Sequence, residues 1–362
     1  MAERERTIAD LESLVDTLPA AERERFARIF LVATDTADVV VPPTMRAEVE
    51  ALFGGVEPVL RQTLVRVTNL ITLDGTLFNP LRQRRPHDER HAAQVEIPGP
   101  GAEDPFCAPL ERTTENSFGR VRGAHSVTAA NLVPIERFHS VIILDEHDPL
   151  AFTEASIADA LETALAWARL AHSADADARY FMLFWNCLWR AAASRVHGHM
   201  QAVLGKGIHY AQVEALRRAA LLYRIGHGVD YFADLCAAHE ALGLGVQTQG
   251  AHVFAYLAPK KEKEVWVIAD RIGPAFVHGI YGALRAYVQH LGVQSFNLAL
   301  LWHPIDSVPE DWTGFPVIAR MLDRGPLHSK MSDVGAMEFF GSSVVSSDPF
   351  RVADALRQSL SA

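Results

Sequence analysis

The stretch between Tyr180 and Gln201 constrains the fold more than any other part of the sequence, because polar side chains occupy every second position at its end. Successive residues of a β-strand point to opposite faces, so His197, His199 and Gln201 are predicted to share one face of a sheet. Burying three polar side chains costs free energy unless each has a partner. The pattern predicts a functional strand, and the alternative is an edge strand with two ordinary histidines.

The residues that precede the histidine pair favour a functional site. An imidazole titrates near neutral pH, so a neutral ring can act as a nucleophile, a general base or a metal ligand. Asn186 lies eleven positions before His197, and Ser194 lies three positions before it. A run of alanines at 191–193 allows the backbone to come close to a ligand. We therefore expect residues 186–201 to form a site.

This arrangement resembles the motif of the galactose-1-phosphate uridylyltransferase branch of the histidine-triad superfamily, which includes dinucleoside polyphosphate and nucleotide-sugar phosphorylases. The family motif reads Asn, small residues, Ser, His-Pro-His-Gly-Gln, and the spacing of its polar members is reproduced here. Gly198 stands at the usual proline and Met200 at the usual glycine. The resemblance implies that His199 is the catalytic nucleophile and that Gln201 and Ser194 hold phosphate oxygens.

A basic loop at residues 80–86 is a second candidate for binding an anionic ligand. It follows a predicted hairpin whose turn is Asp74-Gly75. Three arginines in four residues lie between two prolines, and the guanidinium fork suits phosphate oxygens; a solvated surface loop is the alternative. Uridylyltransferases have a similar Pro-x-Arg-x-x-Arg-Pro element that contacts the nucleotide-sugar. By this resemblance Arg82 and Arg85 bind the substrate.

The resemblance also implies two substrate-binding asparagines. Asn186 belongs to the main motif. Asn131 stands at about the place where relatives have an Asn that meets the nucleoside, and a turn residue is the alternative for this position. We expect both side chains to contact the substrate.

The same family holds zinc with a Cys-x-x-Cys pair, a later histidine and the first histidine of the main motif. The matching residues here are Asp104, Cys107, His147 and His197. Asp104 replaces the first cysteine, and carboxylate, thiolate and imidazole groups can all ligate zinc in a tetrahedron. The resemblance therefore implies a structural zinc and no organic cofactor. The alternative is a site that has lost its metal and kept an ordinary turn.

Length and composition predict a soluble globular protein. A chain of 362 residues that is 49% apolar and 22% charged can bury a large core. The net charge of −10 argues against nucleic-acid or anionic-membrane partners, which need uncompensated lysines and arginines. Cys107, Cys187 and Cys236 cannot all pair with one another and are typical of reduced thiols. The charged N-terminus and the lack of a long apolar span complete the prediction of a cytoplasmic protein.

The pattern of elements predicts an α+β protein. Residues 1–62 show helical spacing and are predicted to be an N-terminal helical extension. Residues 63–205 form a first half with the motif, and residues 206–362 form a second half. By the family resemblance, each half is a histidine-triad-like antiparallel sheet with packed helices, and the protein is a homodimer.

The resemblance implies a nucleotidyltransferase. It would act on a nucleotide-sugar or another nucleoside-diphosphate compound through a covalent nucleotidyl-histidine on His199, and pass the nucleotide to a phosphorylated acceptor such as a sugar phosphate. Val345 stands where relatives have a sugar-reading Gln, and no His-x-His pair follows His303 to complete the family's second metal site. A phosphorylase or hydrolase with the same intermediate is therefore one alternative. A non-catalytic nucleotide-binding protein is another.

Overall fold

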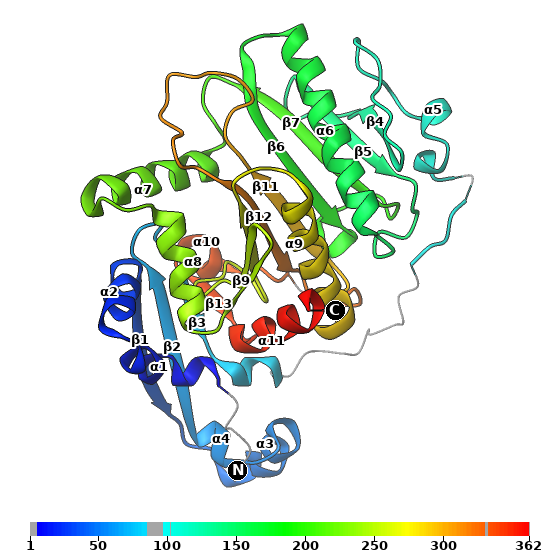
Figure 1. The fold of residues 1–362 in the computed structure, drawn as a ribbon. Helices are drawn as coiled ribbons and strands as arrows, with labels where there is room; N and C mark the ends of the chain where they lie inside the picture. The colour runs from blue at the N-terminus through cyan, green and yellow to red at the C-terminus, as the bar shows by residue number, and fades with distance from the viewer. Residues whose placement is uncertain (1–5, 85–96, 102, 330–331, 362) are drawn as a thin grey trace.

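The computed structural model describes residues 6–84, 97–101, 103–329 and 332–361, whose backbone forms two β-sheets with helices packed around them (Figure 1). One sheet has nine strands and the other has four. The predicted α+β class with antiparallel sheets is confirmed. None of the described helices is both long and apolar enough to cross a membrane.

The nine-stranded sheet carries the main motif. All neighbouring strands in it are antiparallel. From one edge to the other, the strands are β4 (Ser126–Ala130), β5 (Phe138–Leu144), β7 (His199–Lys206), β6 (Ala178–Cys187), β11 (Phe296–Leu301), β12 (Val317–Asp323), β10 (Val265–Ala269), β9 (Ala251–Ala255) and β8 (Gly245–Thr248). The two predicted halves therefore share one continuous sheet, because β6 pairs with β11.

Three long helices pack against this sheet (Figure 1). They are α6 (Glu154–Ala174), α9 (Pro274–Arg285) and α11 (Pro349–Leu360). The sequence determines where α6 begins, because the hydroxyl of Thr153 accepts a hydrogen bond from the Ser156 amide at 3.0 Å. This cap ends the loop that follows β5 and starts the helix that leads to β6.

Strand β6 has one buried face and one partly open face. Phe181, Leu183 and Trp185 are fully buried and lie in the same apolar core as Trp167 of α6. Asn186 has the opposite parity in the strand and is only partly buried. Helices thus cover one face at the centre of the sheet, while the motif side chains belong to the other face.

The remaining helices are short or lie around the edges of the sheets. They are η1 (Ile8–Asp10), α1 (Leu11–Thr17), α2 (Ala20–Ile29), η2 (Pro43–Met45), α3 (Arg46–Phe53), α4 (Glu57–Leu60), η3 (Pro80–Arg84), η4 (Pro105–Cys107), α5 (Pro109–Arg112), η5 (Trp189–Ala191), α7 (Ala211–His227), α8 (Tyr231–Ala241), the π-helix η6 (Ala286–His290) and α10 (Ala336–Phe340). Most were not predicted individually.

The four-stranded sheet corrects the prediction for the N-terminal region. Its strands in order are β1 (Phe30–Asp38), β2 (Arg61–Asn69), β3 (Gly75–Phe78) and β13 (Ser343–Val345), with β13 parallel to β3. The predicted hairpin is confirmed by the pairing of β2 and β3, but its turn spans residues 70–74 and Gly75 is the first residue of β3. Residues 1–62 are not wholly helical, because β1 pairs with β2 along its whole length. That tertiary partner outweighs the local helical spacing.

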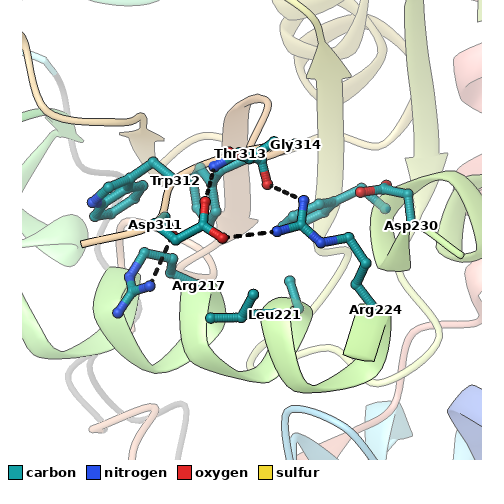
Figure 2. Close-up of a pocket in the computed structure, with 11 residues that line it drawn as sticks. Arg217, Leu221, Arg224, Asp230, Asp311, Trp312, Thr313 and Gly314 are labelled. Atoms are coloured by element: carbon teal, nitrogen blue, oxygen red, sulfur yellow. Dashed lines mark hydrogen bonds and ion pairs between the residues drawn. The ribbon is translucent and has the colours of Figure 1, made fainter. Parts of the chain in front are cut away.

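A cleft lies between α7 and the loop that joins β11 to β12 (Figure 2). Arg217 donates a hydrogen bond to the carbonyl oxygen of Asp311 at 2.9 Å, and Arg224 donates one to the carbonyl oxygen of Thr313 at 2.7 Å. Both guanidinium groups therefore hold the loop in place. His303 is the second residue of this loop, and its Nδ1 atom lies 2.7 Å from the carbonyl oxygen of Pro304.

Candidate active site and metal centre

His199 is the first residue of β7 and is buried, with 6% of its surface exposed. Its Nδ1 atom lies 2.7 Å from the carbonyl oxygen of His197. A carbonyl oxygen can only accept, so Nδ1 carries the ring proton and the Nε2 atom of the neutral ring keeps its lone pair. Burial lowers the pKa of His199, and the hydrogen bond to the carbonyl of His197 opposes this shift in part. The ring is therefore neutral at physiological pH.

Gln201 lies two residues further along β7 and shares the face of His199. Its Oε1 atom is 2.9 Å from the Nε2 atom of His139 and 3.5 Å from the Nδ2 atom of Asn131. Asn131 therefore lies beside Gln201, and its contact with the substrate stays a prediction. The sequence did not single out His139 as a site residue, although its position in β5, with Val141 and Ile143 after it, follows the same period of two.

Asn186 occupies the neighbouring strand β6. It pairs with Asn297 of β11, and the Nδ2 atom of Asn297 lies 2.7 Å from the Oδ1 atom of Asn186. The register of β6 and β7 pairs Phe184 with Gln201, and continuing it by two residues places Asn186 opposite His199. Three predicted site residues, on two adjacent strands, therefore lie on one face of the sheet.

Ser194 lies in the connection between η5 and β7, where its side chain is exposed. Leu188 precedes η5 and Ala192 follows it, and their φ angles are 66° and 69°. Left-handed backbone is uncommon for residues other than glycine and costs about 1–3 kcal/mol at each position. The surrounding structure therefore holds the small-residue segment in a strained turn next to the motif.

The predicted arginine pair is only partly described. Arg82 is exposed on η3, which follows β3 of the four-stranded sheet. No side-chain hydrogen bond joins it to the described residues near His199. Arg85 lies outside the described residues. The predicted contact between these arginines and the substrate stays a prediction.

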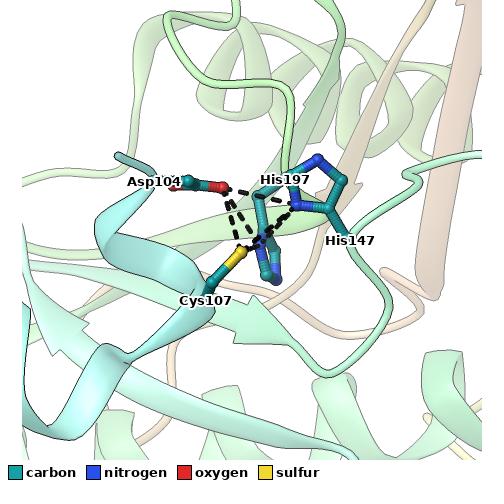
Figure 3. Close-up of side chains that lie close together, drawn as sticks. All are labelled: Asp104, Cys107, His147 and His197. Atoms are coloured by element: carbon teal, nitrogen blue, oxygen red, sulfur yellow. Dashed lines mark hydrogen bonds and ion pairs between the residues drawn. The ribbon is translucent and has the colours of Figure 1, made fainter. Parts of the chain in front are cut away.

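Four predicted metal ligands come together from three parts of the chain (Figure 3). Asp104 precedes η4, Cys107 is its last residue, His147 follows β5, and His197 precedes β7. One ligand atom from each residue lies within 4.8 Å of every other. The sequence placed these residues at distant positions, and the fold gathers them.

The distances between the donor atoms fit a tetrahedral zinc. With ligand bonds of about 2.0–2.3 Å, tetrahedral geometry places two nitrogens about 3.3 Å apart and a sulfur and a nitrogen about 3.6 Å apart. The Nδ1 atoms of His147 and His197 are 3.3 Å apart, and Cys107 Sγ lies 3.5 Å and 3.7 Å from them. The Oδ2 atom of Asp104 lies 3.5 Å from the Nδ1 atom of His147 and 3.2 Å from that of His197.

The backbone fixes the tautomers of both candidate ligand histidines. His197 Nε2 lies 2.8 Å from the carbonyl oxygen of Leu144, and His147 Nε2 lies 3.0 Å from that of Pro98. Each Nε2 must therefore donate, which leaves both Nδ1 lone pairs directed at the same point. Two lone pairs that face each other repel, and a cation between them would attract both. The four residues can therefore hold a metal ion.

Phe106 lies between the four candidate metal ligands and the ring of His199. Its ring lies edge-on to His199, with centroids 5.2 Å apart, and edge-on to His197 at 6.0 Å. It belongs to η4, between Asp104 and Cys107. A shift of η4 would therefore move the aromatic neighbour of His199 together with two candidate ligands.

Comparisons with known proteins agree with this fold. No family model and no curated protein matches the sequence. An ADP-glucose phosphorylase from Arabidopsis thaliana with bound ADP-glucose has a similar structure, with a TM-score of 0.61 at 16% identity, over 80% of this chain and 97% of that chain. A uridylyltransferase structure gives 0.57 at 15% identity, over 82% and 98%. A GALT-like protein from Arabidopsis thaliana gives 0.56 at 17% identity, over 71% and 92%.

These similarities span most of the chain and nearly the whole length of each solved structure. The chain therefore has the fold of uridylyltransferases and of ADP-glucose phosphorylase. This confirms the fold that the resemblance implied.

Proposed function

We propose that the protein transfers a nucleotidyl group from a nucleoside-diphosphate compound through a covalent bond to His199. The observation that carries the proposal is the 2.7 Å contact between His199 Nδ1 and the carbonyl oxygen of His197. It leaves the Nε2 lone pair of the neutral ring available as a nucleophile. The fold shared with uridylyltransferases and ADP-glucose phosphorylase supports the same chemistry.

The reaction consists of two displacements at one phosphorus atom. The Nε2 lone pair of His199 forms a bond to the α-phosphorus, and the phosphorus–oxygen bond to the leaving phosphate breaks, its electron pair departing with that oxygen. An oxygen of the acceptor then attacks the same phosphorus and breaks the phosphorus–nitrogen bond. Splitting one transfer in this way replaces a single difficult encounter between two anions with two positioned steps.

Polar groups around His199 would stabilise the charge on the phosphate oxygens. We assign this role to the amide groups of Gln201 and Asn186 and to the hydroxyl of Ser194, with Arg82 and Arg85 on the departing phosphate. Removing one preorganised donor typically costs roughly 3 kcal/mol of barrier, or at least a hundredfold in rate.

We propose that zinc binds Asp104, Cys107, His147 and His197. Their donor distances and fixed tautomers support this assignment. When bound, zinc would supply structural crosslinking of η4, the segment after β5 and the segment before β7. Because the ion would lie on His197 and not on His199, we assign it no chemical step.

The acceptor is the part of the substrate on which the family resemblance is weakest. Val345, at the position of the sugar-reading Gln, is a buried residue of β13 paired with Phe78. A side chain in that environment cannot bind a hexose. This observation favours inorganic phosphate as a second candidate acceptor, which would make the protein a nucleotide-sugar phosphorylase.

A labelling experiment tests the proposal. Wild type is incubated with ADP-glucose or UDP-glucose carrying ³²P at the α-phosphate, and then quenched in base. We expect base-stable, acid-labile label on wild type and on the surface variant His290→Asn, and none on His199→Asn. Wild type that takes up no label from either compound, or His199→Asn that takes up as much as wild type, would contradict the proposal.

The same labelled protein identifies the acceptor. Adding glucose 1-phosphate, galactose 1-phosphate or inorganic phosphate to separate samples shows which compound discharges the label. Rapid loss only with a sugar phosphate indicates a transferase. Rapid loss with inorganic phosphate indicates a phosphorylase, and equal loss in buffer alone indicates a hydrolase.

A further inference from the structure

We infer that His139 and Asn297, which the sequence did not single out, are positioning residues for the active site. Each holds the carbonyl oxygen of one site amide and so turns the NH₂ group of that amide toward the substrate. The two amides belong to Gln201 and Asn186. This role rests on the proposed function, because it gives both NH₂ groups a phosphate to bind.

The four residues lie on one face of four neighbouring strands. β5 carries His139, β7 carries Gln201, β6 carries Asn186 and β11 carries Asn297. In the register, Val141 of β5 pairs with Gln201, and His139 shares the parity of Val141. The strand of His139, β5, therefore lies beside β7, and the strand of Asn297, β11, lies beside β6.

The tautomer of His139 follows from a backbone donor. The amide of Ile135 lies 3.2 Å from His139 Nδ1, and an N–H group can only donate, so Nδ1 must accept. The ring proton is then on Nε2, which lies 2.9 Å from the Oε1 atom of Gln201. This oxygen accepts, and the NH₂ group of Gln201 remains available for another acceptor.

The orientation of Asn297 follows from an arginine in the same way. Arg324 can only donate, and its Nη1 atom lies 2.6 Å from the Oδ1 atom of Asn297. The amide nitrogen of Asn297 therefore donates to the carbonyl oxygen of Ala191 at 3.0 Å and to Asn186 Oδ1 at 2.7 Å. The NH₂ group of Asn186 is then left for another acceptor, as in Gln201.

Arg324 is itself held in place. Its Nε and Nη2 atoms donate to the two carboxylate oxygens of Asp333 at 2.7 Å and 2.9 Å. Such a bidentate pair fixes the plane of the guanidinium group. Arg324 orients Asn297, and Asn297 orients Asn186. This series of hydrogen bonds thus starts from a guanidinium group that is fixed in the second half of the chain.

The hydrogen bonds that end at Gln201 and those that end at Asn186 have the same effect, because each leaves the NH₂ group of the amide free. An amide that is free to turn can present either its NH₂ group or its carbonyl oxygen, and a carbonyl oxygen repels an anionic phosphate. Here a fixed donor occupies each carbonyl oxygen before any substrate arrives, so neither amide must reorganise during the reaction. Loss of either positioning residue should therefore slow formation of the nucleotidyl-histidine.

A set of matched variants tests the role of His139. The rate of label transfer from α-³²P ADP-glucose to His199 is measured in a single turnover. His139→Leu should be about a hundredfold slower than wild type, whereas His139→Gln, whose amide can donate from nearly the same place, should regain most of the rate. Equal rates in His139→Leu and wild type, or equal loss in both variants at equal melting temperature, would overturn the role.

The double variant separates positioning from a general effect on folding. If His139 acts through Gln201, adding His139→Leu to Gln201→Ala should cause no further loss of rate, because there is no amide left to orient. Two losses that simply multiply would overturn the inference. Asn297→Asp makes the same test for Asn186, because the carboxylate still accepts from Arg324 but cannot donate.

A measurement without substrate distinguishes this inference from the proposed function. Nitrogen-15 NMR of the labelled imidazole should find the proton of His139 on Nε2, and a crystal structure of His139→Leu should find the Gln201 amide turned. A proton on Nδ1, or an unchanged amide, would overturn the inference even if His199 is labelled. If wild type takes up no ³²P on His199 but His139 carries its proton on Nε2, the proposed function is overturned. The orientation of the two amides is then still established.

Discussion

The Nδ1 atom of His199 lies 2.7 Å from the carbonyl oxygen of His197, a residue whose own Nδ1 atom faces the other candidate metal ligands. One short segment therefore sets the tautomer of the proposed nucleophile with its backbone and contributes to the metal group with its side chain. Gly198, between the two histidines, joins these functions. Changes at this glycine should affect both.

Gly198→Pro, which would restore the usual residue of the family motif, should destabilise this protein. The amide of Gly198 donates to the carbonyl oxygen of His147 at 3.1 Å, and a proline has no proton to donate. A β-carbon at this position would lie 2.7 Å from the carbonyl oxygen of Glu146. We expect the free energy of unfolding to fall by about 1–3 kcal/mol or more, measured by urea unfolding.

Gly198→Ala separates the steric effect from the lost hydrogen bond, and Gly226→Ala is its control. Gly226 lies in α7, and no neighbour comes within 4 Å of an added β-carbon. Alanine there should stabilise the helix by about 0.5–1 kcal/mol. A Gly198→Ala protein as stable as wild type would contradict the predicted clash between the added β-carbon and the carbonyl oxygen of Glu146.

Zinc should be lost when one candidate ligand is removed. We expect elemental analysis to find about one zinc per wild-type chain and much less in Cys107→Ser, because the thiolate is one of four ligands. A chelator should lower the melting temperature of wild type more than that of Cys107→Ser. Cys236→Ser is the control, because this buried thiol is not among the four. Full zinc content in Cys107→Ser would contradict the assignment.

His239 should make the protein sensitive to acid. Its Nδ1 atom donates to the carbonyl oxygen of Leu235 at 2.8 Å and its Nε2 atom accepts from the amide of Leu257 at 3.2 Å, so the buried ring is satisfied only when neutral. Burial lowers the pKa of His239 to about 4. Unfolded chains bind this proton near pH 6.5, so the stabilisation is complete above that pH and is lost as the pH falls toward 4.

The full contribution of this histidine is about 3 kcal/mol, at roughly 1.4 kcal/mol for each unit of pKa. Urea unfolding of wild type and His239→Gln at several pH values between 7.5 and 4.5 measures it. The stability of wild type should fall more steeply than that of the variant. If the free energy of unfolding depends on pH equally in both proteins, protonation of His239 does not destabilise the fold.

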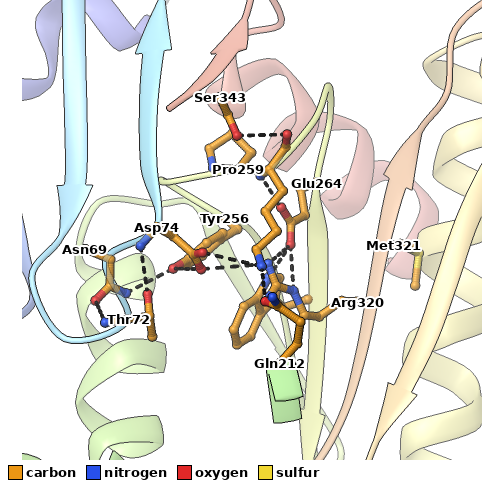
Figure 4. Close-up of polar contacts among 12 residues, drawn as sticks. Asn69, Thr72, Asp74, Gln212, Tyr256, Pro259, Glu264, Arg320, Met321 and Ser343 are labelled. Atoms are coloured by element: carbon orange, nitrogen blue, oxygen red, sulfur yellow. Dashed lines mark hydrogen bonds and ion pairs between the residues drawn. The ribbon is translucent and has the colours of Figure 1, made fainter. Parts of the chain in front are cut away.

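The ion pair between Arg320 and Glu264 should be costly to break from one side (Figure 4). The two groups are 2.6 Å apart, the carboxylate is fully buried, and the guanidinium lies over the ring of Trp266 at 4.3 Å. Arg320→Met leaves the carboxylate buried without its partner and should cost about 3–5 kcal/mol. Adding Glu264→Gln removes that charge and should recover part of the loss in urea unfolding. A double variant less stable than Arg320→Met would contradict this account.

Local patterns were sufficient for part of the fold and for selecting candidate residues of the site. Turn chemistry at Asp74-Gly75 predicted the hairpin. The spacing of the motif and its family resemblance selected His199 and Gln201, which share one face of β7. These features depend on residues that are close in the sequence, so they can be predicted from the sequence alone.

Pairings between distant residues could not be predicted in this way. Strand β1 exists because β2 lies beside it, and its own residues had indicated a helix. His139 is 62 positions from Gln201, and Asn297 is 111 positions from Asn186. No periodicity connects residues so far apart. The homodimer, the contacts of Arg82 and the cytoplasmic location stay predictions.

The sequence by itself determined which chemical groups line one face of the central strand, because the alternation of side chains along a strand is a local property of the backbone. Only the tertiary structure decided which nitrogen of His147 and of His197 carries the proton, and which end of the Gln201 and Asn186 amides is free. Those choices depend on donors and acceptors that the fold brings from remote strands and loops, and a hydrogen bond acts only between groups that are in contact.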